Sequence, residues 1–128
     1  LDNELLNSYW ADGLIIATPT GSTAYSLSCG GPIIMPGSGN LVITPISPHN
    51  LNVRPIVVNE NMKLHLEIES RTEKYILSCD SKSQTLSTKT SLTITKAPFD
   101  INLIRLANDQ YFSILREKLL WGIDVRNY

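Results

Sequence analysis

A stretch rich in hydroxyl groups and glycine, residues 18–32, constrains this chain more than any other part of its sequence. It holds six serine and threonine side chains ahead of the pair Gly30-Gly31. A short apolar run, residues 13–17, leads directly into it and predicts a buried strand. Pro19 and Gly21 then interrupt the strand pattern. We therefore expect a strand, a tight turn and the start of a short helix, in that order.

The short helix is predicted to begin at Ser22 or Thr23 with a hydroxyl N-cap. Ala24 and Leu27 would form its small apolar face, and Gly30-Gly31 would end it. A helix start presents unpaired backbone N–H groups, and neighbouring hydroxyls can bond ribose, amide or phosphate oxygens. This chemistry fits a nucleotide, although clusters of serine, threonine and glycine are also ordinary turns and caps. Composition alone leaves both interpretations open.

The rest of the chain alternates mostly between apolar and polar residues, which is typical of strands with one solvated face. Strands of this kind are predicted at residues 64–68, 75–79 and 92–94. More fully buried strands are predicted at residues 41–43 and 55–58, and turns at residues 37–40, 59–61 and 81–83. Many short strands at near-regular spacing indicate a mainly β domain whose antiparallel sheets form two layers.

One longer helix is predicted near the end of the chain. Asn108 or Asp109 can cap its start, and Gly122 closes it. Its apolar face and its basic last turn are formed by Phe112, Leu115, Leu119 and Lys118. The expected domain therefore has two helices, one after the turn near Gly21 and one at the C-terminal end.

The composition argues against several classes of partner. A net charge of −1 with no basic block argues against nucleic acid or an anionic membrane as a main partner. The apolar runs are far too short to span a bilayer. Cys29 and Cys79 lack CxxC spacing, so we interpret them as reduced thiols that act as small buried side chains, which indicates a cytoplasmic setting. His49 has no second histidine nearby, so we expect no metal site.

The string DGLIIATPTGSTAYSLS, residues 12–28, closely resembles the signature of the C-terminal domain of NAD kinases. These ATP-dependent enzymes phosphorylate NAD at the 2′-hydroxyl of its adenosine ribose to give NADP. The resemblance continues over nearly the whole chain, at residues 45–51, 54–55, 79–81 and 111–122. It implies the C-terminal domain of the NAD kinase/diacylglycerol kinase-like fold, with NAD and ATP as small-molecule partners and Mg²⁺ accompanying ATP. The exposed edges that a two-sheet domain leaves predict a homo-oligomer through sheet contacts, either a dimer or a tetramer.

The resemblance places NAD against the Thr-Ala-Tyr-Ser-x-Ser segment, so we expect Thr23, Ala24, Tyr25 and Ser28 to bind it. Thr23 and Ser28 can donate to or accept from ribose and amide groups. Ala24 is small enough for a ring to approach the backbone, and Tyr25 offers an aromatic face or a phenol edge. The alternative for Tyr25 is a core aromatic residue at a sheet edge.

Two further residues are expected to contact NAD on the same resemblance. Asp12 matches an acidic position beside the nicotinamide end, where a carboxylate can accept from the carboxamide or offset the pyridinium charge. Its alternative is an ordinary turn residue. Ser47, in a loop made rigid by Pro45 and Pro48, matches a position that contacts NAD from a neighbouring subunit. Members of the family often have a basic residue two places before the aspartate, but Trp10 stands there, so we assign it no charge contact.

Asp80 is a weaker candidate for an NAD contact. Asp80-Ser81 matches a turn that continues with glutamine in many family members, but Lys82 stands in that place and Gln84 follows two residues later. Either the turn is longer here or the glutamine contact is lost. The alternative for Asp80 is a hairpin-turn residue.

The chain begins with Leu1, and its first six residues look like the second half of a β-hairpin. In NAD kinases an α/β domain ahead of this region holds a Gly-Gly-Asp-Gly motif, which binds ATP and supplies the catalytic aspartate, and an Asn-Glu pair that contacts NAD. We assign neither motif here. We therefore expect residues 1–128 to be the NAD-binding and oligomerisation domain of a longer enzyme, with no catalytic residue of its own and no activity in isolation.

Two alternative functions stay open. A lipid kinase of the diacylglycerol and sphingosine group shares the two-domain plan, but the string at residues 18–28 and the adjacent Asp12 match NAD kinases better. A non-catalytic module would use the same β domain for oligomerisation or for sensing a dinucleotide. Other catalytic patterns are missing from the sequence: a P-loop lysine, a G-x-S-x-G elbow, zinc-ligand spacing and Rossmann glycines.

Overall fold

The computed structural model describes residues 1–102, 104 and 110–122. The chain forms two compact units, Leu1–Lys96 and Ala97–Tyr128. The elements of the first unit are β1 (Gly13–Ala17), a 3₁₀ turn (Gly21–Thr23), α1 (Tyr25–Ser28), β2 (Asn40–Ile46), β3 (Ile56–Asn59), β4 (Leu64–Leu66), β5 (Lys74–Cys79), β6 (Lys82–Ser87) and β7 (Leu92–Ile94). The second unit contains α2 (Tyr111–Leu119). The predicted mainly β class is confirmed.

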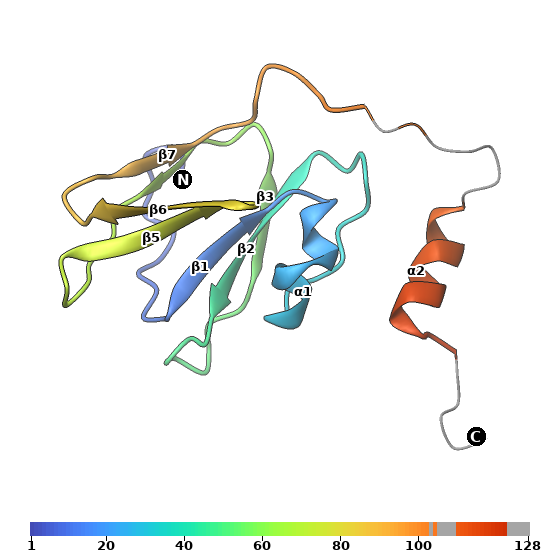
Figure 1. Cartoon of the computed structure of the whole chain (residues 1–128), viewed down its shortest axis with the longest axis horizontal. Coiled ribbons are helices and arrows are strands. Elements are labelled where there is room, and N and C mark those ends of the chain that lie inside the picture. Colours follow the sequence, from blue (N-terminus) through green and yellow to red (C-terminus); the bar gives the residue numbers. More distant parts are fainter. Residues whose placement is uncertain (103, 105–109, 123–128) are drawn as a thin grey trace. The chain divides into compact units, whose positions relative to one another are not determined.

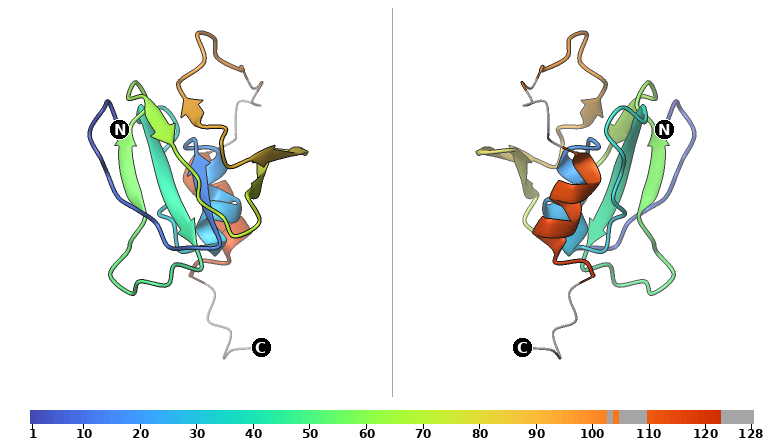
Figure 2. Two further views of the ribbon diagram at one scale, coloured as in Figure 1. Left: turned by 90° about the vertical axis from the view of Figure 1, so that its left-hand side faces the viewer. Right: turned by 90° about the vertical axis from the view of Figure 1, so that its right-hand side faces the viewer.

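The described strands form three sheets, and every pairing in them is antiparallel (Figure 1). The largest sheet has the order β1-β2-β3, with Gly13 opposite Ile46 and Ile43 opposite Ile56. β4 pairs with β7, and β5 pairs with β6. Figure 2 shows the β5–β6 ribbon extending away from the three-stranded sheet. β2 is therefore the central strand of the largest sheet, with β1 and β3 at its two edges.

The two faces of the three-stranded sheet are covered by different segments. On one face the sheet packs against β4 through a cluster of buried residues: Leu41, Ile43, Val58 and Leu64. On the other face a smaller cluster joins the sheet to the segment after α1: Ala17, Ile34 and Val42. Neighbouring residues of a strand point to opposite faces, so Val42 and Ile43 belong to different clusters. The packing of β4 on this sheet confirms the predicted second layer.

Two strand predictions need correction. The expectation of a more fully buried strand at residues 55–58 is wrong, because β3 is an edge strand and only its Val58 face is covered; Val57 is 44% exposed. The turn predicted at residues 81–83 lies one residue earlier, since β6 already begins at Lys82.

Both cysteines are free thiols, but Cys79 is exposed at the end of β5, so its predicted role as a buried apolar side chain is wrong.

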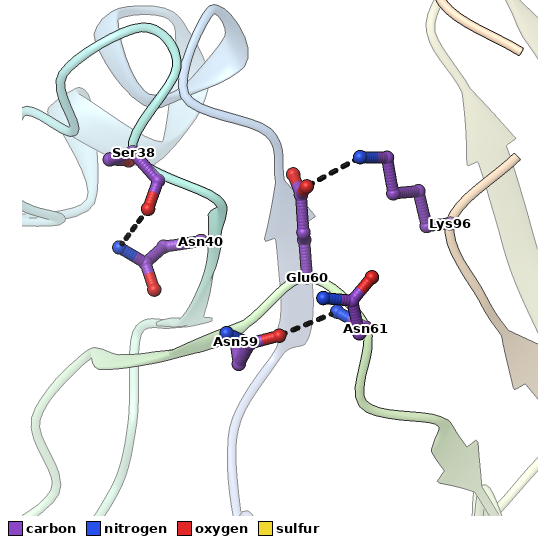
Figure 3. Close-up of polar contacts among 6 residues, drawn as sticks. All are labelled: Ser38, Asn40, Asn59, Glu60, Asn61 and Lys96. Carbon is purple, nitrogen blue, oxygen red and sulfur yellow. Dashed lines mark hydrogen bonds and ion pairs between the residues drawn. The ribbon is translucent and has the colours of Figure 1, made fainter.

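An ion pair links the β3–β4 turn to the segment after β7 (Figure 3). The Glu60 carboxylate accepts a hydrogen bond from the Lys96 ammonium group. The Glu60 backbone N–H donates to the Gly39 carbonyl over 2.9 Å, and the Asn59 side chain accepts from the Asn61 N–H over 2.9 Å. These contacts tie the end of β3 to the residues just before β2.

The short helix starts later than predicted. The 3₁₀ turn comes first, and α1 begins at Tyr25 with Ala24 as its N-cap. The predicted hydroxyl N-cap is therefore wrong, because the hydroxyls of Ser22 and Thr23 already donate to carbonyl groups of the preceding turn. Gly30, with a φ of 81°, follows the helix in the left-handed conformation expected of a glycine stop.

The predicted apolar face of this helix is also wrong. Ala24 is exposed and Leu27 is only half-buried, whereas Ser22 and Ser26 have no exposed surface. Ala24 between them has a non-helical backbone (φ −101°, ψ −128°), so the two serines belong to separate turns. A buried hydroxyl must find a hydrogen-bond partner, and the sheet and its flanking segments supply one for each serine.

In the second unit, α2 differs from the prediction at one position of its apolar face. Leu115 is buried and Leu119 half-buried, but Phe112 is 55% exposed. Tyr111 takes the place of Phe112 on the apolar face, because Tyr111 lies four residues before Leu115 and so shares the same side of the helix.

The ends of α2 also differ from the prediction. Lys118 lies in the last turn as predicted, and the helix ends at Leu119 with Leu120 as its C-cap, which has a φ of 55° and lies two residues before Gly122. The predicted caps Asn108 and Asp109 lie outside the described residues. No helix in the described part of the chain is long and apolar enough to cross a membrane.

Candidate functional site

Two buried serines fold the hydroxyl-rich segment back onto the sheet. After β1 ends at Ala17, the Ser22 N–H closes the turn by donating to the Thr18 carbonyl over 2.9 Å. The Ser22 hydroxyl donates to the Pro19 carbonyl (2.6 Å) and accepts from the Ile34 N–H (3.0 Å). Ser22 has no exposed surface, so its hydroxyl serves the fold and is closed to a ligand.

The second buried serine fastens α1 to β2. Ser26 Oγ and Thr44 Oγ1 share a hydrogen bond of 2.8 Å, and neither residue has exposed surface. The Gly31 N–H donates to the Ser26 carbonyl over 2.8 Å. A Cβ atom at Gly31 would lie 2.3 Å from Ser26 Oγ and 2.8 Å from Thr44 Oγ1, so only glycine fits there. α1 accordingly lies beside the three-stranded sheet in Figures 1 and 2.

The residues around these serines are exposed. Thr23, Ala24, Tyr25 and Ser28 all lie at the surface, and Tyr25 is 59% exposed. Successive residues of an α-helix are separated by about 100°, so burial of Ser26 turns its neighbours away from the sheet. The structure thus brings four of the seven predicted residues together on one short exposed segment. Because Tyr25 is exposed, its alternative interpretation as a core aromatic residue is wrong.

Side chains rather than the helix dipole provide the polar groups of this segment. α1 is a single turn, so few peptide dipoles are aligned in it. The Thr23 hydroxyl donates to the Thr20 carbonyl over 3.3 Å, and its oxygen keeps acceptor capacity at the surface.

Two more predicted residues lie where β1 begins and β2 ends. The Asp12 N–H donates to the Ile46 carbonyl (2.9 Å), and the His49 N–H donates to the Trp10 carbonyl (2.8 Å). Asp12 Oδ1 lies 3.9 Å from His49 Nε2, which makes an ion pair only when the imidazole is protonated. Ser47 is exposed with a φ of 46°, a left-handed conformation uncommon outside glycine. This second group is also open to a ligand.

The two groups are connected through β1 and β2, a few residues apart along the strands. Ser26 is bonded to Thr44, and Thr44 pairs with Ile15 in the middle of β1. From Asp12 to Ile15 the chain advances about 10 Å at the usual rise of a strand. A dinucleotide has two nucleosides joined by a pyrophosphate, so its two ends can reach separate groups of residues.

Asp80 lies in a different sheet from both groups. It occupies the turn between β5 and β6, where it is exposed and has a φ of 50°. Cys79 pairs with Lys82, so the turn is short, and Gln84 lies inside β6 opposite Leu77. Asp80 therefore has the position of a hairpin-turn residue, and the possibility of a longer turn is excluded.

Two surface depressions lie elsewhere in the described part of the first unit. One of about 370 Å³ is lined by Glu67, Ile68, Glu69, Thr88, Lys89 and Ser91, and one of about 200 Å³ by Leu1, Glu4, Leu5, Leu6 and Met62. None of the seven predicted residues lines either depression. Small-molecule sites normally bury most of the ligand surface. The exposed segment near Tyr25 is open, so a ligand bound there needs a second wall.

Sequence reasoning missed the residues that hold the exposed segment in place: Ser22, Ser26, Gly31 and Thr44. The spacing of the two serines was not a usable signal, because the backbone of Ala24 between them is not helical. Thr44 was a usable signal, because a polar residue inside a buried strand needs a hydrogen-bond partner. The pattern does not reveal that Thr44 and Ser26 are partners, because 18 positions separate them.

The model of the ATP-NAD kinase C-terminal domain family matches residues 1–106. The chain belongs to this family. The match confirms the resemblance carried by the string at residues 12–28. Curated members similar to the chain include the NAD kinase of Cytophaga hutchinsonii, 52% identical over 99% of this chain and 44% of its own length, and that of Flavobacterium psychrophilum, 54% identical over 99% and 43%. The chain therefore spans less than half the length of these family members.

Two solved structures of the same fold are similar to the chain. Yeast NADH kinase, complexed with NADH, has a TM-score of 0.72 and 29% identity, and the match covers 99% of this chain and 38% of the yeast chain. An NAD kinase from Archaeoglobus fulgidus, in complex with ATP, has a TM-score of 0.57 and 28% identity, covering 77% of this chain and 37% of its own. The family to which the chain belongs thus includes proteins solved with a dinucleotide and with ATP.

Proposed function

We propose that this chain is the NAD-binding part of an NAD kinase, which transfers the γ-phosphoryl group of ATP to the 2′-hydroxyl of the adenosine ribose of NAD. The observation that carries the proposal is the exposed segment Thr23, Ala24, Tyr25 and Ser28, which two buried serines hold on the surface. Family membership and the NAD kinases that resemble the chain support it.

Each exposed residue suits a different part of the dinucleotide. Tyr25 presents an aromatic face on which a base can stack, and Ala24 leaves the backbone accessible beside it. Thr23 and Ser28 can hydrogen-bond ribose hydroxyls. The Asp12 carboxylate suits the nicotinamide end, where it can accept from the carboxamide or offset the charge of the oxidised ring.

The contribution of these residues to phosphoryl transfer is positioning. Transfer depends mainly on holding the attacking hydroxyl in line with the γ-phosphate and on neutralising charge. In this proposal the chain fixes the acceptor ribose, while an ATP-binding domain in the remainder of the enzyme supplies the donor and the base. The Mg²⁺ that accompanies ATP neutralises phosphate charge. The described residues contain no group of three or more His, Cys, Asp or Glu that could hold a metal ion, so we assign Mg²⁺ no ligand in this chain.

The proposal includes assembly into a dimer or tetramer in the cytoplasm, where Ser47 of one subunit completes the NAD site of another. The left-handed backbone of Ser47 supports a special role, because strained residues persist where the surrounding structure holds them. The open surface around Tyr25 supports it as well, since a neighbouring subunit or domain would supply the missing wall.

The test is NADP production by the full-length protein, measured with NAD and ATP as substrates. Tyr25→Ala is expected to raise the KM for NAD about tenfold, the loss that removal of a stacked ring causes, and to leave the KM for ATP unchanged. Phe99→Ala removes an aromatic residue of similar exposure outside the segment, at 69%, and is the matched control. The isolated 128-residue chain is expected to produce no NADP.

The outcomes separate the alternatives. Phosphorylation of diacylglycerol or sphingosine in place of NAD would identify a lipid kinase, which the NAD kinase family match disfavours. Binding of NAD or NADP without any phosphoryl transfer by the full-length protein would identify a dinucleotide sensor. An unchanged KM for NAD in Tyr25→Ala would remove the segment from the NAD site.

A further inference from the structure

Within the described residues, the Ser26–Thr44 hydrogen bond is the side-chain hydrogen bond that joins α1 to the three-stranded sheet. The helix is four residues long, and a single turn of helix is not stable by itself in water. Its neighbours on the surface, Tyr25 and Ser28, make no contribution to that orientation through burial because both are exposed. The buried Ser26 lies between them in sequence, so its hydrogen bond contributes to the direction in which they project.

The partner of Ser26 lies in the buried centre of the three-stranded sheet. Thr44 belongs to β2, the central strand, and sits opposite Ile15 of β1. Gly31 closes over the pair, since a Cβ atom there would lie 2.8 Å or less from both hydroxyl oxygens. A hydrogen bond excluded from water in this way is stronger and more directional than one at the surface.

We propose that Ser26 and Thr44 are positioning residues for the NAD substrate. This inference rests on the proposed function and names two residues that do not touch the ligand. Ser28 lies about 200° round the helix from Ser26, on the side away from the sheet, and Tyr25 lies about 100° round it. Loss of the buried bond frees α1 to rotate or shift, and a small displacement of Tyr25 and Ser28 weakens several contacts to the ligand at once.

The experiment compares Ser26→Ala, Thr44→Val and the double variant in the full-length protein, measuring KM for NAD, KM for ATP and kcat. Each single variant is expected to raise the KM for NAD about fivefold, equivalent to the loss of one hydrogen bond, while the KM for ATP stays unchanged. The KM for NAD of the double variant should be no higher than that of either single variant, because the same Ser26–Thr44 hydrogen bond is lost in all three. Thr44→Ser keeps the hydroxyl and should restore the KM for NAD to near the wild-type value.

A matched control removes a hydroxyl from a hydrogen-bonded pair elsewhere. Thr93 Oγ1 of β7 lies 3.2 Å from His65 Nδ1 at the surface, and Thr93→Val should leave both KM values unchanged. A lower melting temperature of Ser26→Ala with an unchanged KM for NAD would overturn the inference, as would an equal rise of both KM values. If the wild type phosphorylates NAD, such results refute the positioning role alone; if it does not, the proposed function fails and this inference fails with it.

Discussion

At the scale of single residues, burial decides whether each hydroxyl group of residues 18–28 bonds within the fold or faces a ligand. Ser22 and Ser26 have no exposed surface and are bonded within the fold, whereas Thr23 and Ser28 nearby are exposed. A buried hydroxyl that loses its partner costs about 1–3 kcal/mol, so the inward serines have to keep their bonds. The outward residues can exchange water for a ligand at little cost. The hydroxyl groups of residues 18–28 are thus divided between buried ones that hold the segment in place and exposed ones that can bind a ligand.

Gly31→Ala tests the close packing over the Ser26–Thr44 pair. The added Cβ would lie 2.3 Å from Ser26 Oγ and 2.8 Å from the Ser26 carbonyl oxygen, which is backbone and cannot turn aside. We expect the free energy of unfolding to fall by about 1–3 kcal/mol. Urea unfolding measures it, with Gly21→Ala as the control because its Cβ would meet only contacts of 3.5 and 3.7 Å. Equal stability of the two variants would contradict the packing.

Tyr9→Phe tests a buried hydroxyl oxygen that makes no hydrogen bond within the described residues. Burial raises the pKa of the Tyr9 phenol, and the nearby Asn7 side chain offsets this only in part. The folded state therefore holds the proton more tightly than the unfolded chain. The resulting stabilisation is fully present below the ordinary pKa of about 10 and is lost as the pH rises through the folded-state pKa.

We expect Tyr9→Phe to be neutral or stabilising at neutral pH, because it removes an unpaired polar atom. Above a pH of about 10 the variant should lose less stability than the wild type. Urea titrations at neutral and alkaline pH measure the two free energies of unfolding. Equal losses in the two proteins would show that the phenol does not ionise differently in the folded state.

At the scale of elements, the sheets differ in how firmly they are held. β2 is buried for five residues in succession and pairs with β1 on one side and β3 on the other. β5 and β6 pair only with each other among the described strands, and most of their residues are exposed. A two-stranded ribbon is at most marginally stable in water. The Glu60–Lys96 ion pair, which is partly exposed, adds at most about 1 kcal/mol.

Hydrogen exchange of the isolated chain should show this difference in stability between the sheets. Amide protection follows burial and the number of bonded neighbours, so β2 is expected to exchange last and the β5–β6 ribbon well before it. Mass spectrometry of peptides covering each strand measures the rates. Protection of β6 equal to that of β2 would show that the ribbon is held by contacts beyond its own pairing.

At the scale of the whole molecule, the proposed function predicts that further polypeptide covers the exposed segment. The chain spans less than half the length of the curated family members, and its candidate NAD contacts lie on an open surface. Exposed sheet edges are templates for pairing with another chain. Completion of the site by another domain and another subunit follows from the proposed function.

We expect the full-length protein to form a homo-oligomer of closed symmetry, a dimer or a tetramer. Light scattering coupled to size-exclusion chromatography measures its mass over a range of protein concentrations. Because NAD is proposed to bridge subunits through Ser47, added NAD should shift a partly dissociated sample toward the oligomer. A protein that stays monomeric at every concentration would refute both the assembly and the bridging role of Ser47.

Several features of the fold could be predicted because they depend on local pattern. Alternation of apolar and polar residues was enough for β5 and β7, and the continuous apolar runs at residues 13–17 and 41–43 were enough for β1 and β2. Local pattern failed for β3, whose exposure depends on which neighbours cover the sheet, and for the helix start near Thr23. There the hydroxyls could bond either the helix or the preceding turn, and propensity does not distinguish the two.

By itself, the sequence determined the family, the β class and the segment that carries most of the candidate NAD contacts, because these depend on residue identity and short-range spacing. Only the tertiary structure decided which hydroxyls of that segment are exposed and which are bonded inside. That decision depends on contacts between distant positions, such as Ser26 with Thr44 and Ile34 with Ser22. The pairing of a buried hydroxyl is set by the register of the sheet and the fold of the turn, which no local pattern encodes.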